Sequence, residues 1–534
     1  MNNDVIVIGS GFGGAIVACR LAEAGYKVLV LERGRRWDKK TTDKATGYPR
    51  KPDDPWVWDH EHPEKMNGWL DLRVFEHMAV AQGAAVGGGS LIYANISCEA
   101  PPHVFDEPTW PDEINFGELK PYYDKVAAMM NVQRIPDNQW TDRMKLMRDA
   151  AVKIGKGDRF KPLELAVTFD PDWNYGINDP HNPNKSRTFI NEQGVEQGTC
   201  IHLGNCDIGC DVNARNTLDR NYIPKAEKHS AQVRPLHLVT DVSPMAGGYR
   251  VSYDELKDGT RIPGQETARL VVIATGSLGS TELLLRCRDI NRSLPGISRF
   301  LGRDWSSNGD FLTPAFYKDR VLDPTKGPTI SSAIDFLDGS EKGQRFWIED
   351  GGVPSLLGDY LLTKTKTPQK NVLAKALIDS IQQLLRNSDP FKNVMPWFAQ
   401  GMDAANGQLE MKRPWWFFGS RRLDLKWDIA ASLPMEDAIV KMHETLSEKT
   451  GGVPLVPPTW SLMKYLVTPH PLGGCSMGDT PAEGVVSHTG EVFGCRNLYV
   501  SDAAIIPEAL GVNPSRTIGA LAERIAKIIV SEGR

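Results

Sequence analysis

The sequence predicts an α/β protein in which a Rossmann-type domain is assembled from separated segments and a second, α+β domain is inserted between them. Three observations predict this fold: a glycine-rich turn between a strand and a helix at the N-terminus, a buried strand at 268–274, and a strand–helix pair at 497–529. Strands buried in parallel sheets are continuous apolar runs, and these strands have that pattern. With 534 residues, the chain is also long enough for two domains.

The N-terminal elements form a βαβ unit. The first strand, the helix and the second strand are predicted at residues 4–8, 15–24 and 27–31. The turn between strand and helix matches the dinucleotide-binding fingerprint: Gly9 permits the turn, Gly11 lets a pyrophosphate approach the backbone, and Gly14 lets the helix pack closely. Glu32 ends the second strand, where it could accept hydrogen bonds from a ribose. The fingerprint alone leaves FAD and NAD open.

Later segments complete the sheet. Further strands are predicted at 233–242, 249–253 and 268–274, and a strand at 497–502 precedes a helix at 517–529. We assign residues 1–36, 75–100, 196–312 and 464–534 to the nucleotide-binding domain. Residues 37–74, 101–195 and 313–463 are assigned to the inserted, substrate-binding domain.

Composition narrows the function classes. A net charge of -5 and a pI near 6.2 argue against nucleic-acid binding. No apolar run reaches the roughly 18 residues of a membrane-spanning helix. The first strand starts so close to Met1 that no signal peptide is expected, which favours the cytoplasm. In that reducing setting the eight cysteines need not form disulfides.

Two polar residues near the C-terminus are the catalytic candidates. His470 lies in Thr-Pro-His-Pro-Leu-Gly-Gly-Cys and Asn513 in Gly-Val-Asn-Pro, where the neighbouring prolines restrict the backbone. Imidazole has an ordinary pKa of roughly 6.5, far below that of an alcohol. It therefore suits taking up a hydroxyl proton while hydride leaves the carbon, and a carboxamide could hold the oxygen or polarise the acceptor. The alternative is that both are structural turn residues.

Four segments carry a family resemblance. They are Val-Gly-Gly-Gly-Ser at 86–90, Ala-Thr-Gly-Ser-Leu-Gly-Ser-Thr-Glu-Leu-Leu at 274–284, and the segments of His470 and Asn513. In this order they resemble the glucose–methanol–choline (GMC) oxidoreductases. The run at 274–284 and Trp305-Ser-Ser-Asn308-Gly309 are most similar to the non-covalent FAD-containing cholesterol oxidases. The resemblance implies a substrate domain built on an antiparallel sheet.

The resemblance also implies a set of FAD-binding residues: Gly9, Gly11, Gly14, Glu32, Gly87, Gly88, Gly89, Ser90, Asn95, Val239, Gly276, Asp502 and Asn513. Residues 93–96 would border the isoalloxazine ring. This chain has Tyr-Ala-Asn-Ile there, where the cholesterol oxidases have Asn, two glycines and Met. The shape of that face is therefore open.

The activity implied is FAD-dependent oxidation of a hydrophobic secondary alcohol to a ketone, with a 3β-hydroxysteroid as the leading substrate. Glu349 resembles a base over the steroid that could also isomerise a double bond, with Asp350 as a rival and a solvated carboxylate as the alternative. Electrons would pass to O2 or to a carrier. Two alternatives remain: a dehydrogenase of sugars or other alcohols that reduces a carrier, and a flavin-binding module without turnover.

Three cysteines depart from the cholesterol oxidases. Cys200, Cys206 and Cys210 have a spacing similar to the cluster-binding segment of FAD-dependent glucose dehydrogenases, which implies an iron–sulfur cluster. His202 could instead complete a zinc site, and three metal-free thiols are the third interpretation.

Four consecutive aromatic residues, Trp415, Trp416, Phe417 and Phe418, are flanked by Lys and Arg. Such a segment is typical of a loop that contacts a membrane surface peripherally. It could equally line the substrate pocket or fill the core of the second domain.

Overall fold

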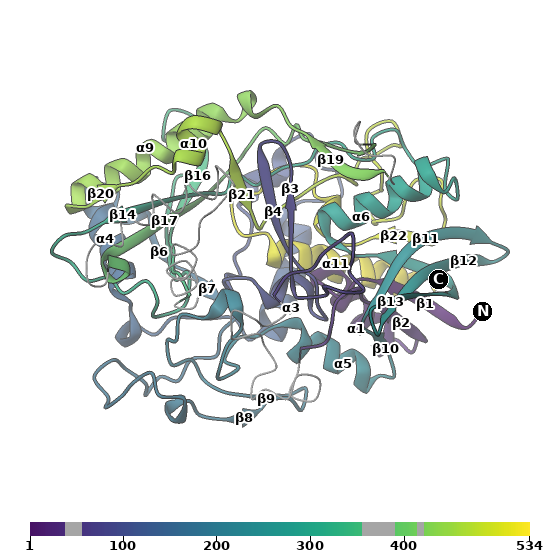
Figure 1. The fold of residues 1–534 in the computed structure, drawn as a ribbon, viewed down its shortest axis with the longest axis horizontal. Coiled ribbons are helices and arrows are strands. Elements are labelled where there is room, and N and C mark those ends of the chain that lie inside the picture. Colours follow the sequence, from purple (N-terminus) through teal and green to yellow (C-terminus); the bar gives the residue numbers. More distant parts are fainter. Residues whose placement is uncertain (38–55, 355–389, 414–420, 534) are drawn as a thin grey trace.

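The computed structural model describes residues 1–37, 56–354, 390–413 and 421–533, and two large sheets dominate it (Figure 1). The sheet that holds the N-terminal strand lies on one side of the molecule, and the second sheet lies on the other. A hairpin of β3 (Leu70–Val74) and β4 (Met78–Gly83) stands between them. The two sheets are therefore separate layers joined through this hairpin region.

The first sheet has seven strands in the order β10-β2-β1-β13-β12-β11, with β22 beside β13. The strands are β1 (Asn3–Ile8), β2 (Val28–Leu31), β10 (Gln232–Arg234), β11 (His237–Met245), β12 (Gly248–Lys257), β13 (Thr260–Ile273) and β22 (Leu498–Val500). β1 pairs in parallel with β2 and β13, and β13 pairs in parallel with β22. The first and last parts of the chain therefore share one sheet.

Helices beside this sheet bury its apolar strands. They are α1 (Phe12–Glu23), α3 (Phe116–Met129), α5 (Tyr222–Lys228), α6 (Gly276–Leu285) and α11 (Ser515–Ser531). α1 packs against α11 and α5, and α11 packs against α3. β2 is buried along its whole length, as expected for a strand covered on both faces.

The second sheet is antiparallel and has the order β20-β14-β17-β16-β15-β6. Its strands are β6 (Phe160–Pro162), β14 (Phe311–Phe316), β15 (Ser332–Asp335), β16 (Phe346–Asp350), β17 (Val394–Gly401) and β20 (Val453–Pro454). Helices α4 (Asp142–Lys153) and α9 (Leu433–Thr450) pack on it. All five residues of β16 are buried, so Glu349 lies inside the protein.

The smaller elements connect the two halves. β21 (Leu466–Thr468) pairs in parallel with β4, and His470 follows two residues after it. The short hairpins are β5–β7 (Gln133–Arg134 and Glu164–Leu165), β8–β9 (Phe189–Ile190 and Glu196–Gln197) and β18–β19 (Gln408–Lys412 and Arg422–Lys426). Helix α10 (Pro458–Met463) precedes β21. In the described ranges, no helix has the length and apolar character needed to cross a bilayer.

The predicted fold class is confirmed: a Rossmann-type sheet drawn from distant segments accompanies an antiparallel sheet. The domain boundaries stay a prediction. The continuous strand predicted at 233–242 is wrong, because the chain breaks into β10 and β11. Pro235 has no amide hydrogen for the ladder, and Leu236 adopts a positive φ of 59°.

Candidate active site

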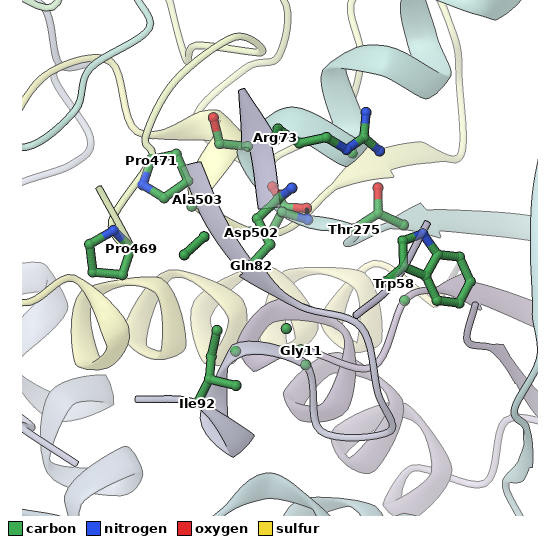
Figure 2. Close-up of a pocket in the computed structure, with 18 of the residues that line it drawn as sticks. Gly11, Trp58, Arg73, Gln82, Ile92, Thr275, Pro469, Pro471, Asp502 and Ala503 are labelled. Atoms are coloured by element: carbon green, nitrogen blue, oxygen red, sulfur yellow. Dashed lines mark hydrogen bonds between the residues drawn. The ribbon is translucent and has the colours of Figure 1, made fainter. Parts of the chain in front are cut away.

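One cavity of about 1320 Å³ extends from the first βα turn to the antiparallel sheet. Figure 2 shows Trp58 and Thr275 toward one side of it, and Pro469 and Pro471, which flank His470, on the other. Ten predicted site residues line this cavity: Gly9, Gly11, Glu32, Gly88, Gly89, Val239, Gly276, His470, Asp502 and Asn513. Gly14, Gly87, Ser90, Asn95 and Glu349 are not among its lining residues.

The glycine turn is built from close backbone contacts. Gly9 has a φ of 93°, and a Cβ there would lie 2.4 Å from the Ala274 carbonyl oxygen. A Cβ on Gly14 would lie 2.1 Å from the Gly9 oxygen, so helix α1 and strand β1 can meet only because this residue is glycine. A Cβ on Gly11 would meet no atom closer than Gly88 Cα at 4.0 Å. The cavity is therefore open beside the N-terminus of α1, where N–H groups favour a phosphate.

Two buried carboxylates fix the turns along this wall. Glu32 accepts hydrogen bonds from Ser10 N (2.9 Å), Ser10 Oγ (2.7 Å) and Gly34 N (2.9 Å). Asp502 accepts them from Gly276 N (2.8 Å), Ser280 Oγ (2.5 Å) and Ala504 N (2.8 Å). Burial raises the pKa of both carboxyls, and these donors oppose that shift. Each carboxylate thus holds a turn while lining the cavity.

The turn after β4 is held from behind by Arg215, which sequence reasoning missed. Its guanidinium donates to Ser90 O (2.6 Å), Leu91 O (3.0 Å) and Asn95 Oδ1 (2.8 Å). Asn95 is fully buried with a φ of 68°, and its side chain faces Arg215. Asn95 is not among the residues that line the cavity, whereas its neighbours Ala94 and Ile96 are, and its Nδ2 has no hydrogen-bond partner in the described part of the chain. Its contact with the cofactor stays a prediction.

His470 is paired with a buried carboxylate. Its Nδ1 lies 2.8 and 3.0 Å from the two oxygens of Asp310, and Thr468 Oγ1 donates to Asp310 at 2.5 Å. With Nδ1–H donated to Asp310, Nε2 is the nitrogen left to accept a proton. Burial lowers the pKa of His470, but Asp310 outweighs it and the net pKa is raised, with a smaller contribution from Glu349. Asp310 was missed, although it directly follows the Asn308-Gly309 pair singled out in the sequence.

Asn513 is buried and its Oδ1 has no hydrogen-bond partner in the described part of the chain. An amide oxygen left unpaired in a buried site is costly unless a ligand meets it. The preceding backbone is held by Asn308, whose Oδ1 accepts from Leu510 N (2.9 Å) and Gly511 N (3.0 Å) and whose Nδ2 donates to Val512 O (2.9 Å).

A single segment therefore positions both candidates. Residues 305–310 contain Asn308, which holds the Asn513 loop, and Asp310, which holds His470. Ser306 pairs with Leu472 through two backbone hydrogen bonds of 3.1 and 3.0 Å. His470 and Asn513 thus line one cavity and are anchored to one short stretch of chain.

Glu349 is fully buried beside this group. Its carboxyl accepts hydrogen bonds from Trp347 Nε1 (2.8 Å) and Gln400 Nε2 (3.2 Å). Burial raises its pKa to about 8, partly opposed by Trp347 and His470, so the group is mostly protonated at neutral pH. The alternative of a solvated carboxylate is wrong. Its rival Asp350 is occupied by Ser331, Ser332 and Arg143, which is a structural role.

The cysteine segment does not form a metal centre. Among the described residues, no group of three or more His, Cys, Asp or Glu side chains could hold a metal ion. His202 is also occupied at both ring nitrogens, by Tyr175 Oη (2.8 Å) and Gln139 Oε1 (3.1 Å). In the metal-free protein, burial raises the pKa of Cys200 and Cys206. The predicted cluster at Cys200, Cys206 and Cys210 is therefore not supported by the described residues.

The aromatic segment Trp415 to Phe418 lies outside the described residues. Its membrane contact stays a prediction.

The residues present fit a flavin dinucleotide. The glycine turn leaves an open cradle beside Gly11, and the unpaired Asn513 Oδ1 lines the same cavity as His470. When bound there, FAD would supply a two-electron acceptor for a hydride. The fold and site define a FAD-dependent oxidoreductase with a Rossmann-type domain and a separate substrate sheet.

Known proteins agree with this class. Residues 422–522 match the family model described as GMC oxidoreductase, and residues 4–56 match FAD dependent oxidoreductase. The cholesterol oxidase of Acinetobacter baumannii is 32% identical, over 98% of this chain and 94% of that protein. The cholesterol oxidase of Mycobacterium tuberculosis is 30% identical, over 99% and 91%. The chain therefore belongs to the GMC oxidoreductase family and is an enzyme acting on CH–OH donors.

A solved structure shows the same fold at low identity. Formate oxidase of Aspergillus oryzae aligns over 99% of this chain and 98% of its own, with a TM-score of 0.64 and 13% identity.

Proposed function

We propose that this flavoenzyme oxidises a hydrophobic secondary alcohol to a ketone, and that a 3β-hydroxysteroid such as cholesterol is the substrate. The observation that carries the proposal is the single cavity that joins the dinucleotide turn to His470 and Asn513. The cavity wall includes Ile92, Ile96, Ile330 and Phe398, which suit an apolar skeleton, and the Phe398 ring lies 6.4 Å from that of His470. The similarity to cholesterol oxidases supports the steroid.

The chain's own residues handle the proton. His470 Nε2 accepts the hydroxyl proton as the hydride leaves the carbon, and Asp310 stabilises the imidazolium that results. Asn513 holds the developing carbonyl oxygen or polarises the flavin edge through its amide N–H, and its unpaired Oδ1 can accept a hydrogen bond from the bound molecule. Both roles need only groups that already line the cavity.

FAD is held mainly by backbone. We assign its contacts to the cavity-lining residues Gly9, Gly11, Glu32, Gly88, Gly89, Val239, Gly276, Asp502 and Asn513. Gly14, Gly87 and Ser90 shape the turns from outside the cavity: Gly87 has a φ of 100°, and Ser90 Oγ donates to its carbonyl at 2.7 Å.

Glu349 is proposed to move a proton in a second step, the isomerisation of a 3-keto-5-ene. The ionised minority of this buried carboxyl takes a proton from the substrate carbon beside the ketone and then returns it at the far end of the shifted double bond. Glu349→Gln should abolish isomerisation while alcohol oxidation continues, measured as accumulation of the unconjugated ketone. Loss of both steps together would contradict a separate role.

The electron acceptor is O2 or a carrier protein or small molecule. Anaerobic mixing with sterols, long-chain alcohols and sugars, followed by re-oxidation with O2 or artificial acceptors, tests substrate and acceptor together. Bleaching of the flavin absorbance by a sterol supports the proposal. Bleaching only by sugars would favour the polyol dehydrogenase, and bleaching by no alcohol would favour a binding module.

A further inference from the structure

A carboxylate that the proposed reaction does not use lies in the same cavity. Asp207 lines the wall, carried by a short 3-10 turn at Cys206–Ile208. The turn is anchored on both sides: Gly327 N donates to His202 O at 3.0 Å just before it, and Ile208 packs against the cluster of Trp69 and Leu91. Asp207 is therefore held in place at the cavity wall.

Thr329 lies next to Asp207 and lines the same part of the cavity. Thr329 is buried, and its Oγ1 has no hydrogen-bond partner with suitable geometry in the described ranges. Burial raises the pKa of Asp207 to about 6, opposed mainly by Arg215, so the carboxyl is ionised at neutral pH. The two groups together offer one strong acceptor and one hydroxyl to a ligand.

The backbone places Thr329 beside the strand that carries Glu349. A Cβ on Gly352 would lie 2.9 Å from the Thr329 carbonyl oxygen, so the two residues are adjacent. Gly352 follows Glu349 by three residues, which span at most roughly 10 Å. Ile330 lines the cavity beside Thr329. The cavity thus has a polar reacting end, an apolar wall and a second polar position.

We propose that Asp207 and Thr329 bind a second hydroxyl of the substrate, and that the substrate is a rigid, largely apolar diol. The hydroxyl remote from the oxidised carbon donates to the Asp207 carboxylate and accepts from Thr329 Oγ1. This inference rests on the proposed function, keeps the 3β-hydroxysteroid class, and replaces cholesterol, which carries an alkyl chain at that end, with a steroid that carries a second hydroxyl. An alkyl chain at this position would leave a charged group partly desolvated and unpaired, which costs binding energy.

The test compares substrates that differ at one position. Purified holoenzyme is mixed anaerobically with a 3β,17β-dihydroxysteroid, with the same skeleton lacking the 17-hydroxyl, and with cholesterol. The rate of flavin reduction divided by the substrate dissociation constant is measured for each. The diol should exceed its 17-deoxy counterpart by at least about tenfold, the effect of one hydrogen bond to a charged group.

Variants test whether Asp207 and Thr329 cause the preference for the diol over the 17-deoxy steroid. Asp207→Leu and Thr329→Val should each reduce the diol's value, by about tenfold and about threefold, and leave the 17-deoxy steroid nearly unchanged. Asp211→Asn is the matched control, because Asp211 lies in the same loop and is not among the residues that line the cavity. FAD content and the flavin spectrum verify that each variant is folded, and Asp207→Asn replaces Asp207→Leu if the latter loses FAD.

The outcomes separate this inference from the proposed function. If the wild type oxidises both steroids equally well, or if Asp207 variants slow both steroids alike, the second contact is overturned while sterol oxidation stands. A change in flavin potential in Asp207→Asn with no change in selectivity also overturns it. If no steroid reduces the flavin, the proposed function itself fails.

Discussion

The two ends of the cavity are built in opposite ways. The dinucleotide end consists of glycines and backbone N–H groups, with a Cβ excluded at Gly9 and Gly14 by atoms 2.4 and 2.1 Å away. The reacting end consists of side chains, His470 on Asp310 and the Asn513 loop on Asn308, each bond joining segments far apart in sequence. Binding a cofactor tightly requires steric complementarity, which the backbone supplies. Catalysis requires side chains whose protonation state and orientation are fixed by neighbouring groups.

The largest effect is expected at the first end. Gly14→Val places a side chain where a Cβ already meets the Gly9 oxygen at 2.1 Å, so α1 must move off the sheet and FAD binding should be lost. Flavin content after purification measures it. The control is Gly296→Val, since a Cβ on Gly296 has no atom within 4 Å. Full FAD occupancy in Gly14→Val would show that close packing at Gly14 is not required for FAD binding.

At the reacting end, His470→Ala should leave the FAD-binding part of the cavity intact and remove the proposed proton acceptor. We expect flavin reduction by a sterol to slow by roughly 10²–10⁴-fold, the range for loss of a general base, with FAD still bound. Anaerobic stopped-flow spectroscopy at one pH is the measurement. His229→Ala, at an exposed histidine, is the matched control. An unchanged rate in His470→Ala would place the proton acceptor elsewhere.

Asp310→Asn should give a smaller loss with a shift in pH dependence. The carboxylate raises the pKa of His470, and the imidazole accepts a proton only when it is neutral, so the reduction rate rises with pH through that pKa. Without the charge, the pKa falls and the acid limb of the profile moves to lower pH. We expect the maximal rate to drop roughly 10–100-fold as the ring loses its orientation. Asp304→Asn, at the residue just before this stretch and not lining the cavity, should leave the acid limb of the pH profile unchanged.

The smallest effect should come from Asn308→Ala. It removes three buried hydrogen bonds to the 510–512 backbone, for a stability loss of about 3 kcal/mol and roughly tenfold slower flavin reduction. Thermal unfolding and stopped-flow rates measure the two effects separately. Leu312→Ala, an exposed residue on the cavity wall, should change stability little. Slower reduction without lower stability would show that Asn308 acts on the reaction directly.

The same contrast explains what the sequence could predict. The βαβ unit is predictable because its strand, turn and helix are consecutive in sequence, and because its glycines are required by contacts within that unit. The strand break at Pro235 is also predictable from the sequence, because a proline within a predicted strand indicates an edge strand or an interruption. The apolar run at 233–242 does not outweigh this signal.

The partners at the reacting end could not be found in this way. Asp310 lies 160 residues from His470, and Arg215 lies 120 residues from Asn95. Nothing in a local pattern says that such residues meet, because the contacts depend on how the sheets pack. The cysteines show the converse: three thiols at a suggestive spacing remained without a metal-binding arrangement among the described residues.

The stretch at 305–310 has a consequence for engineering. It carries Asn308 and Asp310 and leads directly into β14, the first strand of the substrate sheet in that part of the chain. A chimera that grafts a relative's substrate sheet onto this nucleotide-binding half would cut through or beside it. Crossovers placed before residue 305 would transplant the anchors together with the sheet, whereas crossovers after 310 would keep them with the loops they hold.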